Sequence, residues 1–152
     1  MMTLNLSEVY IERCDKDSED VIAQEQASFL TKPLTHLKQH INEFIYIESN
    51  AFEPIKTESL SLEVDDVFKT YMVLFGFKVQ KKNSTTIKTY FEENLHGENI
   101  YSSMMFSGED GLWDINLPLD NMEGFHEDMT IQEAIELINS FLGKLVSSIV
   151  QQ

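Results

Sequence analysis

The pattern that most restricts the fold of this chain lies in its last third. Apolar side chains recur there at alternating intervals of four and three residues: Ile131, Ile135, Ile138, Leu142, Leu145 and Ile149. Thr130 and Glu133 match a capping box, in which a hydroxyl and a carboxylate satisfy each other's backbone N–H groups. The pattern predicts a long amphipathic helix from Thr130, whose wide apolar face must be covered by a second layer.

The middle of the chain predicts strands that would supply that layer. Phe44–Ile47 is β-branched and aromatic, and Leu60–Val64 alternates apolar and polar residues. Thr70–Lys78 is mostly apolar, which suits a central strand covered on both faces. Tyr101–Phe106 and Leu112–Leu117 flank a glycine-containing turn and predict a hairpin, with one face of the second strand buried and the other wet and acidic.

Four further stretches predict helices. Residues 7–13 and Ser18–Phe29 precede the strands, with Ser18 as N-cap of the second and acids in its first turn. Pro33–Asn42 begins with a proline, which helices tolerate at that position, and Thr86–Leu95 has apolar residues at helical spacing. We therefore expect an α+β fold with N-terminal helices, a five-stranded antiparallel sheet interrupted by one helix (α-β-β-β-α-β-β-α), and a long C-terminal amphipathic helix. Residues 1–152 are predicted to form a single domain, with 1–30 as a helical N-terminal extension and 31–152 as the α/β core.

This order of elements resembles the type III secretion chaperone-like superfamily, which includes the YbjN-like proteins. The resemblance covers residues 18–150, and its most specific part is the acidic strand Leu112–Leu117, the polar loop 120–124 and the capped helix from Thr130. It implies a small acidic protein, commonly dimeric, that holds other proteins or regulates them. The superfamily has no catalytic motif, so no functional residue is carried over.

The charge is unevenly distributed. Of the formal net charge of −15, residues 97–152 carry −9 (ten acids and Lys144), residues 1–30 carry −5, and residues 31–96 carry −1. This balance argues against binding to nucleic acids and anionic membranes, both of which attract basic proteins. The longest apolar run, Met72–Phe77, is far below the roughly 20 residues of a membrane span. With a single cysteine and no apolar leader, the chain is expected to be cytoplasmic.

No residue pattern favours catalysis, a metal or a cofactor. His36 and His40 have the spacing of a metal-binding pair, but the sequence near them supplies no third ligand of the usual type. His126–Glu127 begins like a zinc protease motif, yet Thr130 stands where the second histidine belongs, and the loop Asp120–Asp128 does not fit the calcium-loop pattern. Cys14 lies among acids as well as bases, which favours a structural thiol over a nucleophile.

Two surfaces are candidates for binding another protein. The first is an acidic face formed by Glu109, Asp110, Asp114, Asp120, Glu123, Glu127 and Asp128. The second is an apolar groove or dimer surface formed by Phe75, Phe77, Trp113, Phe141 and Leu145. The simpler interpretations are a solvated surface that aids solubility and an ordinary hydrophobic core.

The sequence thus predicts a non-enzymatic, acidic protein-binding module, chaperone-like or adaptor-like, whose partner is another protein, for instance a basic one, with a homodimer as a further option. An alternative is an acidic inhibitor or immunity protein that mimics nucleic acid and blocks the basic site of a nuclease or DNA-binding protein. A metal-dependent hydrolase is a weaker third hypothesis. Salt separates the first two, because binding by charge mimicry falls more steeply with ionic strength than binding in an apolar groove.

Overall fold

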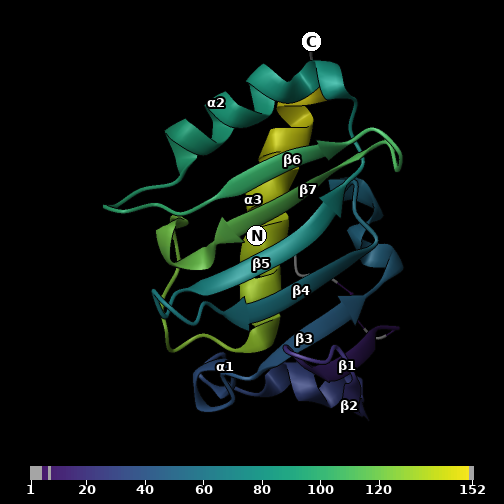
Figure 1. Cartoon of the computed structure of the whole chain (residues 1–152), viewed down its shortest axis with the longest axis vertical. Coiled ribbons are helices and arrows are strands. Elements are labelled where there is room, and N and C mark those ends of the chain that lie inside the picture. The colour runs from purple at the N-terminus through teal and green to yellow at the C-terminus, as the bar shows by residue number, and fades with distance from the viewer. Residues whose placement is uncertain (1–4, 7, 151–152) are drawn as a thin grey trace.

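The computed structural model describes residues 5, 6 and 8–150. Its centre is a seven-stranded sheet in the order β2-β1-β3-β4-β5-β7-β6, in which every neighbouring pair is antiparallel (Figure 1). The strands are β1 (Tyr10–Asp15), β2 (Val21–Glu25), β3 (Glu43–Glu48), β4 (Ser59–Val64), β5 (Tyr71–Phe77), β6 (Ser103–Ser107) and β7 (Leu112–Pro118).

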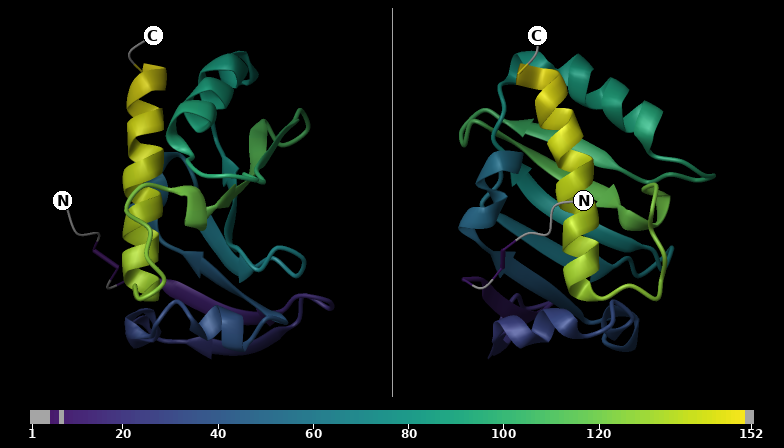
Figure 2. Two further views of the ribbon diagram at one scale, coloured as in Figure 1. Left: turned by 90° about the vertical axis from the view of Figure 1, so that its left-hand side faces the viewer. Right: turned by 180° about the vertical axis from the view of Figure 1, so that it is seen from behind.

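One long helix, α3 (Ile131–Val150), crosses the back of the sheet and covers that face (Figures 1 and 2). The shorter α2 (Ser84–Asn94) lies beside the β6 edge, and the single turn α1 (His36–Gln39) lies near the opposite edge. Short 3₁₀ segments connect these elements: η1 (Ala27–Thr31), η2 (Asn50–Ile55), η3 (Lys81–Asn83) and η4 (Leu119–Asn121). No helix among the described residues has the length and apolarity needed to cross a bilayer.

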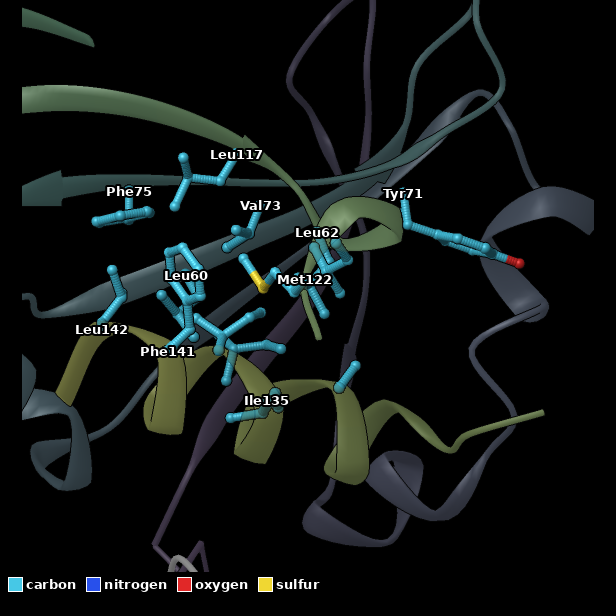
Figure 3. Close-up of a cluster of buried hydrophobic side chains, with 14 of the residues drawn as sticks. Leu60, Leu62, Tyr71, Val73, Phe75, Leu117, Met122, Ile135, Phe141 and Leu142 are labelled. Carbon is cyan, nitrogen blue, oxygen red and sulfur yellow. The ribbon is translucent and has the colours of Figure 1, made fainter. Parts of the chain in front are cut away.

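The core lies between the sheet and α3. Every second residue of β4, β5 and β7 is buried there, as the two-residue period of a strand dictates. Figure 3 shows Leu60, Val73 and Phe75 of the sheet opposite Ile135 and Leu142 of α3. At the start of α3, the Thr130 N–H donates to the Glu133 carboxylate at 2.9 Å and the Glu133 N–H donates to the Thr130 hydroxyl at 3.1 Å. The predicted capping box and terminal helix are confirmed.

The predicted helical extension at the front of the chain is wrong. Tyr10–Asp15 and Val21–Glu25 form the hairpin β1–β2, whereas residues 1–4 and Ser7 lie outside the described part of the chain. The residues interpreted as a helix start form the turn instead. The Asp15 carboxylate accepts from the N–H groups of Asp17 and Ser18, and the Ser18 hydroxyl accepts from the Asp20 N–H. Asp and Ser bind nearby backbone donors equally well in a turn and in a helix cap, so local sequence did not separate the two.

The five-stranded layout is therefore also wrong, because the hairpin adds two strands to one edge of the sheet. The helix predicted over Pro33–Asn42 is reduced to His36–Gln39, since Pro33 bridges Thr130 and the Leu34 N–H donates to the Met129 carbonyl.

β5 is not covered on both faces. Tyr71, Val73, Phe75 and Phe77 are buried, but the residues between them are only half-buried. The predictions of β3, β4, α2 and the β6–β7 hairpin are confirmed to within a few residues.

Candidate binding face of the sheet

The face of the sheet that points away from α3 is not crossed by any helix of the described chain (Figure 2). We call it the open face. Strand pairing aligns the residues on it in rows across the sheet, and one row runs from β1 to β6 through Glu12, Tyr46, Ser61, Leu74, Asn116 and Ser103. Residues from strands far apart in the sequence therefore form one continuous surface.

The middle of the open face is apolar. Phe44, Tyr46, Met72 and Leu74 are half-buried there by their neighbours on the sheet, without a covering layer. Gly76 leaves room for the Leu112 side chain, whose methyl groups would lie 3.4 Å from a Cβ at that position. Leu112 thus extends the apolar area across β5.

Exposed apolar side chains continue this area toward the rim. Met105 on β6 is 72% exposed. Phe68 in the β4–β5 turn stacks on Tyr101 before β6, with ring centroids 3.9 Å apart, although Phe68 is 48% and Tyr101 43% exposed. A stacked aromatic pair that stays in contact with water is typical of a contact surface, because aromatic rings supply much apolar area with little conformational freedom to lose.

The charged strand residues of the open face are all acids. Glu12, Glu48, Glu63 and Asp114 point to this side, and the described strands place no Lys or Arg there. The hydroxyls of Tyr10 and Tyr46 donate to Glu12 and Glu48, and the bond to Glu12 is the main reason that the pKa of Tyr10 rises to about 12. The face therefore combines an apolar centre with negative potential.

A hollow of about 350 Å³ on this face already holds one ammonium group. Its floor includes Phe44 and Leu74, and Lys16 enters it from the β1–β2 turn. The Lys16 Nζ donates to the Val64 carbonyl at 2.7 Å and to Asp66 at 2.9 Å, and lies 3.5 Å from Glu63. Asp66 is held ionised, because this hydrogen bond and the charge of Lys16 lower its pKa. This hollow therefore holds an ammonium group through one carbonyl and two carboxylates, in a site that apolar side chains also line.

The acids selected from the sequence do not form one surface. Glu109 and Asp110 lie in the turn before β7, whereas Asp120, Glu123, Glu127 and Asp128 follow its other end. Seven residues of strand separate the two groups by about 20 Å. Of these acids, Asp114 lies on the open face of β7.

Several of these acids are bound within the protein. An Asp120 oxygen accepts a hydrogen bond from the Tyr71 N–H at 2.7 Å. Burial of the carboxyl raises the pKa of Asp120, and this hydrogen bond opposes part of the shift. Glu127 lies 3.3 Å from the Lys38 Nζ and accepts a 3.4 Å hydrogen bond from the Tyr71 hydroxyl, which Figure 3 shows pointing away from the core cluster. These two acids fasten the loop before α3 to the sheet. Glu109, Glu123 and Asp128 are exposed.

The apolar candidates belong to the core. Phe75, Phe77, Trp113, Phe141 and Leu145 are each 8% exposed or less, so they do not form one open groove together, although Trp113 contributes to the wall of a groove beside β6. The simpler interpretation of these residues agrees with the structure. The sequence did contain a signal for the open face, because the alternation of Leu60–Val64 directs Ser61 and Glu63 away from the core. Glu12 was missed because β1 was interpreted as a helix.

The residues considered for metal binding and nucleophilic chemistry form no reactive site: His36 and His40 lie in and next to α1, and Cys14 lies on β1 opposite Phe44. His36 and His40 stack with ring centroids 4.1 Å apart, and within residues 5, 6 and 8–150 no cluster of three His, Cys, Asp or Glu residues is arranged to hold a metal ion. Cys14 is buried, and its burial raises the pKa of the thiol, which makes it a poorer nucleophile.

Comparison of the chain with protein-family models, curated proteins and solved structures finds no match. The resemblance to the secretion chaperone-like superfamily therefore rests on element order alone. That order differs at the front of the chain, where two strands replace the expected helices.

Proposed function

We propose that this protein is a non-enzymatic binding module that receives a basic, partly apolar segment of another protein on its open face. The observation that carries the proposal is the combination of acidic strand residues with an uncovered apolar centre. Carboxylates around the apolar centre steer a cationic partner and speed its association, whereas burial of apolar area supplies most of the affinity.

The ammonium of Lys16 supports a basic partner, because a carbonyl and two carboxylates hold this cation in a hollow that Phe44 and Leu74 also line. Asp17 and Glu19 also line this hollow and are exposed to a second cation. The partner would therefore present Lys or Arg next to apolar side chains.

An acidic inhibitor of a nuclease or DNA-binding protein is a narrower form of the same proposal. A mimic of nucleic acid would bind mainly through its carboxylates, so its affinity would collapse with added salt. The apolar centre formed by Phe44, Tyr46, Met72 and Leu74 favours a partner that also buries apolar side chains.

The test compares two charge-matched triple variants in affinity capture from the native host. The open-face triple is Glu12→Gln, Glu63→Gln and Asp114→Asn, and the control triple is Glu53→Gln, Glu123→Gln and Asp128→Asn, exposed acids in η2 and in the loop before α3, outside the strands that form this face. Partners identified by mass spectrometry are purified and titrated calorimetrically at low and high salt.

We expect the open-face triple to bind at least about tenfold more weakly and the control triple to bind like the wild type. If both triple variants lose the same affinity, the loss comes from the lower net charge and not from the open face. Failure of the wild-type protein to retain any partner would contradict the proposal. Loss of all affinity at about 0.5 M salt would select the inhibitor form, because screening at that concentration is nearly complete beyond a few ångströms.

A further inference from the structure

Strand β6 leaves one edge of the sheet unpaired. It is last in the strand order and pairs only with β7. Among the described residues, the one backbone hydrogen bond that β6 makes outside this ladder runs from the Gly111 N–H to the Ser107 carbonyl. In an antiparallel strand, alternate N–H and C=O groups point to the outer side, so β6 presents a row of unpaired groups there.

The sequence of β6 does nothing to block that edge. Soluble proteins usually protect edge strands with lysine, proline or another charge. Ser103–Ser107 reads Ser-Met-Met-Phe-Ser and contains none of these. The edge is therefore chemically open to another strand.

A groove of about 580 Å³ runs between this edge and α2. Its apolar lining comes from both sides: Phe91 and Leu95 on α2, Ile100 in the following loop, Met104 on β6 and Trp113 on β7. The polar lining is Ser84, Lys88, Glu92, Ser102 and Ser103. A strand added beside β6 would direct every second side chain under α2, into this groove.

The charges around the groove favour a basic occupant. The chain contains no Lys or Arg between Lys88 and Lys144. Lys88 and Glu92 both line the groove and offset each other, and the exposed Glu93 and Glu98, which lie on either side of Leu95 in the chain, leave this end of the groove acidic on balance. A second copy of this chain pairing edge to edge would bring these acids close to acids of its own kind, which repel. A basic segment from a different protein would be attracted instead.

We infer that an extended, basic segment of a partner protein adds to β6 as an eighth strand. Its alternate apolar side chains fill the groove between β6 and α2, and its Lys or Arg residues meet Glu93 and Glu98. This inference rests on the proposed function, because it names the way in which one segment of the bound partner is held. The open face and the groove lie on either side of β6, so one partner chain can reach both.

The only tryptophan of the chain makes the groove directly observable. Trp113 lines it and is 5% exposed, so its fluorescence reports on an occupant. The probes are four tryptophan-free peptides of about nine residues, each with alternating apolar and threonine positions. Two use valine and two use phenylalanine as the apolar residue, and each pair has two lysines at either the N-terminal or the C-terminal end.

We expect saturable binding of at least one peptide with a Kd below about 1 mM, together with slower amide hydrogen exchange in β6. A matched peptide with N-methyl groups on alternate residues loses its backbone donors and should bind at least about tenfold more weakly. Ile100→Lys should weaken binding in the same way, whereas Ile22→Lys on the opposite edge strand should not. Ile100 and Ile22 are both exposed, so neither variant disturbs the core, and circular dichroism confirms the fold.

Four results would overturn the inference: no saturable binding by any of the four peptides, equal binding of the N-methylated peptide, unchanged exchange in β6, or concentration-dependent dimers that protect β6 without peptide. These results leave the proposed function standing if the open-face triple still loses the captured partner. If instead the peptides bind β6 while the open-face triple retains its partner, the proposed open-face contact fails and the strand addition remains.

Discussion

The hydroxyl of Tyr90 donates a 2.5 Å hydrogen bond to the main-chain carbonyl of Phe141, and this bond joins α2 to α3. The two rings also meet edge to face, with centroids 5.1 Å apart. Burial raises the pKa of Tyr90 to about 12, so the hydroxyl keeps its proton at ordinary pH. The position of α2, and with it one wall of the β6 groove, depends on this contact.

Tyr90→Phe should lower the free energy of unfolding by about 1 kcal/mol, because the ring is kept and one partly buried hydrogen bond is lost. Urea denaturation measures the change. Tyr101→Phe is the control, since no side chain or backbone group in the described chain is bonded to that hydroxyl. Equal effects of the two substitutions would show that the Tyr90 bond contributes nothing specific.

Lys16→Met should move the urea midpoint down, because the Val64 carbonyl and Asp66 lose their shared donor. Asp66 has a lowered pKa in the folded state, so its contribution is present above its unfolded value and is lost as pH falls through the folded one. The difference between variant and wild type should therefore shrink below about pH 4. If the difference in urea midpoint stays constant from pH 7 to below pH 4, the ion pair between Lys16 and Asp66 is not its cause.

Thr130→Ala removes the hydroxyl that accepts from the Glu133 N–H and should cost about 1 kcal/mol of stability. Thr89→Ala, at an exposed position inside α2, is the matched control and should be neutral or slightly stabilising. Thermal and urea unfolding measure both. If the two substitutions behave alike, the capping box does not stabilise α3.

The partly buried side chain of His36 should make the protein less stable in mild acid. Its pKa is lowered, chiefly by burial and then by His40, while Glu43 opposes the shift and Arg13 and Lys32 add to it. The unfolded chain therefore binds the proton more readily, and stability falls as pH drops below the ordinary value of 6.5.

His36→Gln should flatten the dependence of the urea midpoint on pH between pH 7 and pH 5. His126→Gln, which changes an exposed histidine, should leave that dependence as it is in the wild type. An unchanged slope in the His36 variant would assign the acid sensitivity to other groups.

The parts of the fold that could be predicted are those with a long or repeated pattern. The stripe from Ile131 to Ile149 and the cap at Thr130 identified α3, and alternation identified β4 and β7. Val21–Glu25 was not identified as a strand, because three apolar residues followed by two polar ones do not alternate and the Asp15–Asp20 turn before it has the composition of a helix start. Short edge strands take their structure from pairing, which local sequence does not show.

The acidic face was predicted in composition but not in place. Counting acids by sequence position joined Glu109 to Asp128, although β7 holds them at opposite ends of the strand. The open face instead unites Glu12, Glu63 and Asp114 from three strands, which requires knowledge of the strand order. Register across a sheet is a long-range property, so it could not be read from the chain.

The placement of α3 over the sheet has a consequence for biosynthesis. A ribosome makes all seven strands before it makes α3, so a chain that stops short of α3 has no layer to cover the apolar side of the sheet. A premature stop before residue 131 would leave Val73, Phe75 and Leu117 permanently in water. Such a truncated product should aggregate or be degraded rather than accumulate as a smaller working protein.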